Sequence, residues 1–309
     1  MGHKPRIKIM ATLAPYVDHR ADIIGHPLVN ELRFNSVMPV AESKLELLAR
    51  LKKECQGKKI WLDLKTRQLR VKKFAYLPYA FVELSHKIKV NLPTIIYFKD
   101  CTAKIVEIYN GNKLILAERP SQNRVGEGEP VNILDPSLQV EGFLTENDEE
   151  YIAAAKKLGL HNYLLSFVEK AQDIEDLLGL DPQAKIIAKI ESQQGLNFVR
   201  SEYKNLKKVG LMAARDDLYI NMGEQKTQML QALSAIIKAD KSAYCASRLL
   251  TSLEQAEIVA LQDLSDLQLM LLTGYKNFLL SDMQCFRAQV FAKTMEILSQ
   301  FFQKGKSYA

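Results

Sequence analysis

Several features that would assign this chain to a class are scarce or missing. The cysteines show no Cys-x-x-Cys or other metal-binding spacing, so we interpret them as reduced thiols. The five histidines stand apart from one another, which favours structural or exposed roles over metal binding. No apolar run approaches the length needed to cross a bilayer, and the N-terminus lacks an apolar signal core. The four cysteines are Cys55, Cys101, Cys245 and Cys285.

The composition points to an ordinary globular protein. Of the 309 residues, 47% are hydrophobic and 25% are charged, which is typical of a compact domain. The net charge is +6, but the lysines are scattered, and no basic stripe or aromatic-basic repeat indicates nucleic-acid binding. We therefore expect a cytoplasmic protein without nucleic-acid or membrane partners. Its positive charge indicates a solvated surface or an anionic substrate.

Two short apolar segments that end in charge carry the clearest chemical signal. They run from Lys185 to Glu191 and from Leu211 to Asp217, and each is typical of a buried parallel strand with polar groups at its C-terminal end. Lys189 and Glu191 are two residues apart, so on a strand they point to the same side. Carboxylates suit Mg²⁺ or Mn²⁺, and a neighbouring lysine can neutralise a phosphoryl group. Two core strands with solvated ends would give the same pattern.

The order of the expected elements predicts a (β/α)8 TIM barrel in the α/β class. Alternating strands and helices imply a parallel sheet, and eight such units imply a closed barrel. Helical stretches are expected at Glu42–Lys53, Glu149–Leu158, Gln172–Leu178 and Lys226–Ile237, with a final helix at Ala288–Gln303. The eight strand candidates are 7–13, 31–37, 59–65, 163–168, 185–191, 209–215, 243–247 and 277–282.

The span 71–137 departs from this alternation of strands and helices and predicts a small inserted β domain after the third strand. Strand-like runs alternate with turns, and Asn110-Gly111 between two such runs is a hairpin signal. The barrel is therefore expected from residues 1–70 and 138–309.

Taken together, these segments resemble the pyruvate kinase family over roughly residues 5 to 300. The two charged strands resemble the Lys-Ile-Glu and Ala-Arg-Gly-Asp strands of the family, and the inserted domain resembles its lid, which closes over the barrel mouth. Here the lid is shorter than usual, and the family's C-terminal domain is expected to be absent. Further resembling segments are Ile7–Pro15, Leu32–Asn35, Trp61–Arg70, Leu144–Asp148, Leu165–Val168 and Asp266–Ser281.

The resemblance implies a reaction and a role for each matching residue. The family moves a phosphoryl group from phosphoenolpyruvate to ADP and then protonates the enolate, which implies pyruvate and ATP as products and Mg²⁺ or Mn²⁺ as cofactor. By resemblance, Glu191 and Asp217 hold the metal and Lys189 lies against the phosphoryl oxygens. The other implied roles are phosphate binding for Arg33 and Arg70, monovalent-cation binding for Asn35 and Asp63, a place near the protonation site for Ser247, and nucleotide contacts for Thr12 and Pro15.

Three positions depart from the family pattern at the monovalent-cation site. Val37 and Leu64 replace two hydroxyl ligands, and Gln68 replaces a glutamate associated with potassium dependence. Ser36 lies one residue away and would substitute only if the strand shifted. These departures weaken the case for K⁺ binding that the resemblance would otherwise make.

Other departures fall on the substrate and nucleotide sides. Asp216 replaces a glycine whose backbone approaches the substrate carboxylate, so its side chain would crowd and repel that group. Arg248 replaces a glutamine and is expected to pair with Asp216. Met38 replaces a histidine, Phe286 replaces a lysine, and the arginine of the family loop at Ala260–Asp263 is missing.

Three functions are compatible with this pattern. The first is a minimal pyruvate kinase-like phosphotransferase with weak or altered activity. In the second, the barrel binds phosphoenolpyruvate, pyruvate or oxaloacetate and carries out enolisation or decarboxylation without ADP. The third is a pseudoenzyme that binds a phosphorylated ligand or a protein partner. In each case we expect a monomer or a small homo-oligomer.

Overall fold

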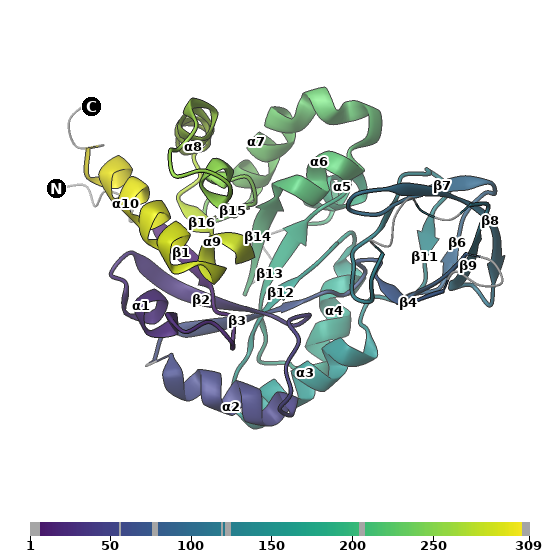
Figure 1. Ribbon diagram of the computed structural model, residues 1–309, viewed down its shortest axis with the longest axis horizontal. Helices are drawn as coiled ribbons and strands as arrows, with labels where there is room; N and C mark the ends of the chain where they lie inside the picture. Colours follow the sequence, from purple (N-terminus) through teal and green to yellow (C-terminus); the bar gives the residue numbers. More distant parts are fainter. Residues whose placement is uncertain are drawn as a thin grey trace. The chain divides into compact units, whose positions relative to one another are not determined.

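The chain folds into two compact units, which Figure 1 colours along the sequence. The computed structural model describes residues 7–55, 57–75, 80–118, 120, 125–203 and 208–304. One unit combines Met1–Leu64 with Glu150–Ala309, and the other is Lys65–Glu149.

The first unit is a closed barrel of eight parallel strands, with helices around it (Figure 1). This confirms the predicted (β/α)8 barrel, and each predicted strand has its counterpart. Each strand pairs in parallel with its two neighbours, and the ring closes where β16 pairs with β1. The strands are β1 (Lys8–Thr12), β2 (Val29–Asn35), β3 (Lys59–Leu64), β12 (Asn162–Leu165), β13 (Lys185–Ile190), β14 (Val209–Ala214), β15 (Tyr244–Ala246) and β16 (Asn277–Leu279).

The predicted helices correspond to five of the helices that follow the strands. These are α2 (Lys44–Glu54), α3 (Glu146–Lys157), α4 (Ala171–Leu180), α7 (Met229–Ala239) and α10 (Ala288–Lys304). The described chain also forms α1 (Arg20–Gly25), α5 (Gln193–Ser201), α6 (Arg215–Asn221), α8 (Leu261–Thr273), α9 (Asp282–Phe286) and the 3₁₀ turns η1 (Gly223–Gln228) and η2 (Thr251–Glu254). None of the helices in these ranges combines the length and apolar character that a bilayer span requires.

The interior of the barrel is filled by side chains, so the chemistry has to lie at its rim. Alternate residues of each strand point inward, and those of the middle layers are mostly apolar. Polar side chains can then gather only where the strands end. The interior cluster contains Met10, Trp61, Leu164, Ile187, Met212, Tyr244, Ala246 and Leu279.

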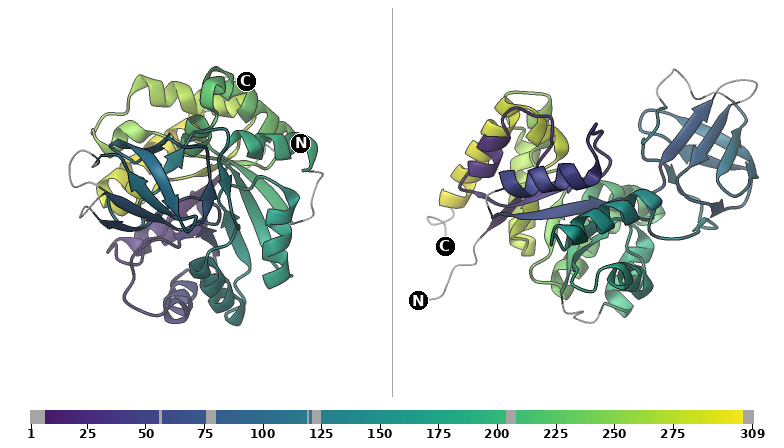
Figure 2. Two further views of the ribbon diagram at one scale, coloured as in Figure 1. Left: turned by 90° about the vertical axis from the view of Figure 1, so that its right-hand side faces the viewer. Right: turned by 90° about the horizontal axis from the view of Figure 1, so that it is seen from below.

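The second unit is built from antiparallel strands, which Figure 2 shows as a curled sheet. The predicted hairpin joins β8 to β9, and its turn residues Asn110 and Gly111 both have positive φ, which these two residue types adopt at low cost. The six-stranded sheet has the order β10 (Asn132–Ile133), β7 (Thr94–Tyr97), β8 (Thr102–Tyr109), β9 (Lys113–Leu116), β5 (Phe81–Leu84) and β4 (Val71–Ala75), and β11 (Gln139–Val140) pairs with β6 (Ile88–Lys89).

The segments that flank this sheet belong to the second unit as well. The backbone N–H groups of Lys65 and Thr66 donate to the two carboxylate oxygens of Asp148, at 3.1 and 3.0 Å. The guanidinium of Arg67 lies over the ring of Phe143. The expected domain boundaries at 71 and 137 therefore fall inside a unit that runs from 65 to 149.

A buried polar cluster ties strand β12 to the end of helix α4, at the N-terminal side of the barrel. Asp181 is almost fully buried, and its Oδ2 accepts from the hydroxyl of Tyr163 at 2.8 Å and lies 2.7 Å from Nδ1 of His161. Burial alone would raise the pKa of Asp181, but the contacts with His161 and Tyr163 outweigh it and lower that pKa. The ionised carboxylate therefore stabilises the fold.

We expect Asp181→Asn to lower the free energy of unfolding by about 1–3 kcal/mol at pH 7, because the buried hydroxyl of Tyr163 loses a charged acceptor. A depressed folded-state pKa gives stability that is present above the unfolded value of about 3.9 and is lost as the pH falls through the folded value. The deficit of the variant should therefore shrink below about pH 4. Chemical denaturation across pH checks this, with Asp176→Asn on the same helix as control. A deficit that does not change with pH would contradict the assignment.

Candidate functional site

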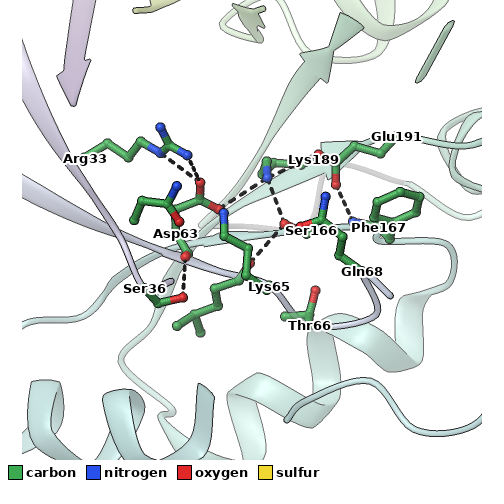
Figure 3. A network of polar contacts seen from close by, with 12 residues as sticks. Arg33, Ser36, Asp63, Lys65, Thr66, Gln68, Ser166, Phe167, Lys189 and Glu191 are labelled. Carbon is green, nitrogen blue, oxygen red and sulfur yellow. Dashed lines mark hydrogen bonds and ion pairs between the residues drawn. The ribbon is translucent and has the colours of Figure 1, made fainter. Parts of the chain in front are cut away.

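The C-terminal ends of the barrel strands gather a network of buried charges around Asp63. This residue lies near the end of β3, is fully buried, and is paired in register with Asn35 of β2. Its Oδ2 accepts from Nε of Arg33 at 2.8 Å and from a terminal nitrogen of the same guanidinium at 2.5 Å (Figure 3). Its Oδ1 lies 3.3 Å from Nζ of Lys189. One carboxylate therefore pairs with two buried cations.

Lys189 is the centre of the polar contacts on the β13 side. Its ammonium group donates to Oγ of Ser166 at 2.8 Å and lies 3.2 Å from Oε1 of Glu191 (Figure 3). The contact confirms that Lys189 and Glu191 point to the same side. Burial lowers the pKa of Lys189, but the charges of Asp63 and Glu191 outweigh that effect and raise it. Lys189 is therefore a fixed positive charge at neutral pH.

Glu191 follows β13 directly, and its carboxylate is hydrogen-bonded by the loop after β12. Its Oε2 accepts from the backbone N–H of Phe167 at 2.7 Å. Phe167 has a φ of +49°, an uncommon value for a non-glycine residue, and such strain tends to occur at functional sites. The loop after β12 thus fixes the orientation of the Glu191 carboxylate.

Asp216 and Asp217 were expected at the end of a strand, but they lie in the first turn of helix α6. Strand β14 ends at Ala214, and the helix begins one residue later. Acidic residues are favoured there because the helix N-terminus carries a partial positive charge. Asp217 still contributes to the site, because its charge raises the pKa of Lys189. Asp216 pairs with Arg248 at 2.5 Å, as expected.

Arg33 and Asn35 share a further partner that the sequence did not reveal. Asp282, the first residue of α9, places Oδ1 against the Arg33 guanidinium, and its Oδ2 accepts from Nδ2 of Asn35 at 2.9 Å. Arg33 also donates to Oγ1 of Thr12 at 2.9 Å. Burial lowers the pKa of Arg33, but the charges of Asp282 and Asp63 raise it above its ordinary value. No motif marked Asp282 in advance.

Ser247 lies just after β15 in a strained conformation that a buried arginine supports. Its φ is +64°, and Arg248 and Leu250 nearby also have positive φ. The carbonyl of Ser247 accepts two hydrogen bonds from Arg215, at 3.0 and 2.5 Å. Arg215 in turn pairs with both carboxylate oxygens of Asp266 at 2.7 and 2.8 Å. Arg215 was not among the predicted site residues, although it stands beside Asp216 in the sequence.

Arg70 belongs to the second unit. Nε and a terminal nitrogen of Arg70 donate to Oε1 of Gln68 at 3.1 and 2.7 Å, and its guanidinium also donates to the carbonyl of Gly128. Its predicted role beside Arg33 and Lys189 stays a prediction.

The predicted nucleotide side combines retained and altered residues. Thr12 ends β1, and its hydroxyl donates to the carbonyl of Leu280 at 3.2 Å. The carbonyl of Pro15 accepts from Arg20 at 3.0 Å. The ring of Phe286 packs edge-on against Tyr16, with 5.8 Å between centroids. An aromatic contact therefore stands where the resemblance placed a lysine.

The carboxylates on the β13 and β14 side fit a divalent metal by their chemistry. Mg²⁺ and Mn²⁺ prefer hard oxygen ligands, and Mg²⁺ commonly uses only one or two carboxylates together with water and substrate oxygens. The carboxylate of Glu191 lies 3.2 Å from the ammonium group of Lys189, and the charge of Asp217 raises the pKa of the same ammonium group. Among the described residues, no cluster of three or more His, Cys, Asp or Glu side chains has the geometry to hold a metal by itself. A metal here would need oxygens from water or substrate.

The comparison with protein families decides the ancestry of this barrel. The model of the pyruvate kinase barrel domain matches residues 50–285, which is more than half of the chain. The chain belongs to the pyruvate kinase family. The sequence resemblance is thereby confirmed at the level of the family and of the fold.

Individual members of the family are distant relatives. Pyruvate kinase from Lachancea kluyveri is 32% identical over 146 residues, which are 45% of this chain and 28% of the relative. Pyruvate kinase from Naumovozyma castellii is 27% identical over 212 residues, which are 65% of this chain and 41% of the relative. The crystal structure of Cryptosporidium parvum pyruvate kinase superposes with a TM-score of 0.72 at 17% identity, over 95% of this chain and 70% of the other. The chain thus matches less than half the length of each of these two curated relatives.

We expect Asp217→Ala to abolish Mn²⁺ binding in calorimetric titration, because it removes one of two carboxylate ligands from the predicted metal site. The matched control is Asp216→Ala, which removes the same charge from the same helical turn and should leave the affinity within a few-fold of wild type. Wild-type affinity in the Asp217→Ala variant would remove the basis of the metal assignment.

Proposed function

We propose that this protein is a divalent-metal-dependent phosphotransferase of the pyruvate kinase type, with phosphoenolpyruvate as phosphoryl donor and a weak or altered activity. The observation that carries the proposal is the buried network in which Lys189, Arg33 and Asp63 meet beside Glu191. Phosphoryl transfer depends on positioning and charge stabilisation more than on covalent chemistry. Fixed cations at the rim of a packed barrel serve that need.

Lys189 acts in this scheme as an electrostatic group. A raised pKa keeps its ammonium protonated at neutral pH, so it stabilises negative charge on the transferring phosphoryl oxygens and does not accept a proton. Its contacts with Ser166 and Glu191 fix its direction before substrate arrives. Lys189 contacts Oδ1 of Asp63, and Arg33 contacts Oδ2. The planar guanidinium of Arg33 has a shape that matches phosphate oxygens.

Glu191 and Asp217 are the residues that would hold Mg²⁺ or Mn²⁺. When bound, such a metal adds positive charge against the phosphate and the enolate oxygen. Potassium is not part of the proposal. Both oxygens of Asp63 already face protein cations, and the hydroxyl of Ser36 donates to the backbone carbonyl of Asp63 at 2.8 Å. These contacts support an enzyme that works without a monovalent cation.

In a second candidate function, the protein binds the substrate at the phosphoryl-donor site and does not use a nucleotide. The aromatic contact between Tyr16 and Phe286 replaces a lysine contact, and Met38 is a buried apolar residue where the family has a histidine. These residues favour enolisation or decarboxylation of phosphoenolpyruvate, pyruvate or oxaloacetate without ADP. A non-catalytic, ligand-binding barrel has no observation of its own in its favour.

A coupled pyruvate assay with phosphoenolpyruvate, ADP and Mg²⁺ or Mn²⁺, with and without K⁺, tests the proposal. We expect slow, metal-dependent turnover that K⁺ does not change. Lys189→Met should reduce turnover by about 10²–10³-fold, since one preorganised electrostatic contact is lost. The control is Lys185→Met on the exposed start of the same strand, which should leave the rate unchanged. Metal-dependent enolisation without ADP would support the second candidate, and neither activity would reject both.

Asp216 and Phe286 are the two departures from the family pattern that we expect to suppress phosphoryl transfer to a nucleotide. We expect the double variant Asp216→Gly with Phe286→Lys to raise ADP-dependent turnover about tenfold or more, because it removes a carboxylate from the substrate side and restores a cationic contact. The measurement is kcat/KM for ADP, with Asp216→Gly alone as control. Equal turnover in the wild type and the double variant would show that these residues do not limit transfer.

A further inference from the structure

Asp282 holds an unusual position, because its carboxylate bridges two residues assigned to ligand binding. One oxygen contacts the guanidinium of Arg33 and the other accepts from the amide of Asn35 at 2.9 Å. Two neighbouring oxygens of a phosphate group can make the same pair of contacts, one with a guanidinium and one with an amide. The carboxylate of Asp282 therefore has the contacts that a bound oxyanion would make.

The position of Asp282 is set by the start of helix α9. Ser281 is the N-cap of this helix, and its hydroxyl accepts from the backbone N–H of Gln284 at 3.1 Å. The side chain of Gln284 accepts from the backbone N–H of Ser281 at 2.9 Å, which completes a capping box. Since the helix start is fixed in this way, the carboxylate of Asp282 is presented to Arg33 by the fold.

Arg33 has little hydrogen-bonding capacity left for an incoming anion. A guanidinium carries five N–H donors. Within the described part of the barrel, Arg33 makes four hydrogen bonds, two to Asp63 and one each to Thr12 and Asp282. The bond to Asp282 is the most accessible of these, because the side chain of Asp282 is 31% exposed while Asp63 is fully buried. Asp282 is thus the partner that an anion can replace.

The balance of charge around the two cations also depends on Asp282. Among the described barrel residues, the carboxylates that interact with Arg33 or Lys189 are Asp63, Asp282, Glu191 and Asp217. A singly charged ligand that replaced Asp282 would bring the same charge to Arg33, whereas a doubly charged phosphate group would bring one more negative charge to the guanidinium.

We propose that Asp282 is a specificity-determining residue that competes with phosphate-type oxyanions for Arg33, so that a ligand has to displace it. It acts through Arg33 as a positioning residue and selects for doubly charged phosphate groups over carboxylates. The inference rests on the proposed function only in taking Arg33 as an anion ligand.

The test is calorimetric titration of inorganic phosphate, and of acetate as a singly charged competitor, into the full chain without metal. We expect Asp282→Asn to bind phosphate about tenfold or more tightly than wild type, since Arg33 gains a free charged donor. Acetate should bind measurably only to the variant. The matched control is Glu254→Gln. It removes a carboxylate that accepts from the hydroxyl of Ser281 at 2.6 Å and that takes part in none of the four described hydrogen bonds of Arg33. Its phosphate affinity should stay within about twofold of wild type.

Two further variants make the result decisive. Asp282→Ser should reproduce the gain if the asparagine variant folds poorly, because it is also short and neutral at the first helical position. Adding Arg33→Met to Asp282→Asn should abolish the gain, which places it at Arg33. Phosphate affinity in folded Asp282→Asn and Asp282→Ser that equals or falls below wild type would overturn the proposal.

The outcome is separable from that of the proposed function. A gain in phosphate affinity without turnover of phosphoenolpyruvate would uphold the role of Asp282 and reject the enzyme. Turnover by the wild type without a gain in the variants would uphold the enzyme and reject the role of Asp282.

Discussion

The pairing of Asp63 with Arg33 and Lys189 is the interaction on which the rest of the barrel mouth depends. Two cations and one carboxylate are removed from water here, and such burial is tolerated only where the charges satisfy one another. Asp63 is fully buried and contacts both cations through different oxygens. It holds the side chains of β2 and β13 at fixed places on either side of β3. The positions of Arg33 and Lys189, two of the three residues predicted to bind the phosphoryl group, follow from this shared anion.

The neighbouring contacts divide the site into a retained part and an altered part. Ser166 and Glu191 contact the ammonium group of Lys189, and the backbone N–H of Phe167 holds the Glu191 carboxylate. On the other side, Asp282 engages Arg33, Asp216 pairs with Arg248, and Phe286 packs on Tyr16. These three contacts add negative charge or aromatic surface near predicted substrate and nucleotide positions. The altered part therefore bears on which ligand binds, while the retained part bears on how a phosphoryl group would be stabilised.

The sequence predicted the barrel and the Lys189–Glu191 pair well because both are local patterns. Alternating apolar segments identify strands, and a separation of two residues on a strand fixes the relative direction of two side chains. The position of Asp217 was less predictable, because β14 ends at Ala214 and a helix begins immediately without a flanking glycine or proline. Asp282 could not be found from pattern alone, since it meets Arg33 across 249 residues of sequence. Arg215 was missed because its partners, Asp266 and the carbonyl of Ser247, come from later strand-helix units.

The most direct test of Asp63 as the organising anion is a measurement of the free energy of unfolding. This quantity is compared between the single variant Asp63→Asn and the double variant Asp63→Asn with Arg33→Met. Removing one partner of a buried charge network leaves the others uncompensated, so the single variant should lose about 3–5 kcal/mol. The double variant should recover part of that loss, because one of the uncompensated cations is gone. If Asp63→Asn unfolded within about 0.5 kcal/mol of the wild type, as a surface substitution does, Asp63 would not be the anion that organises this site.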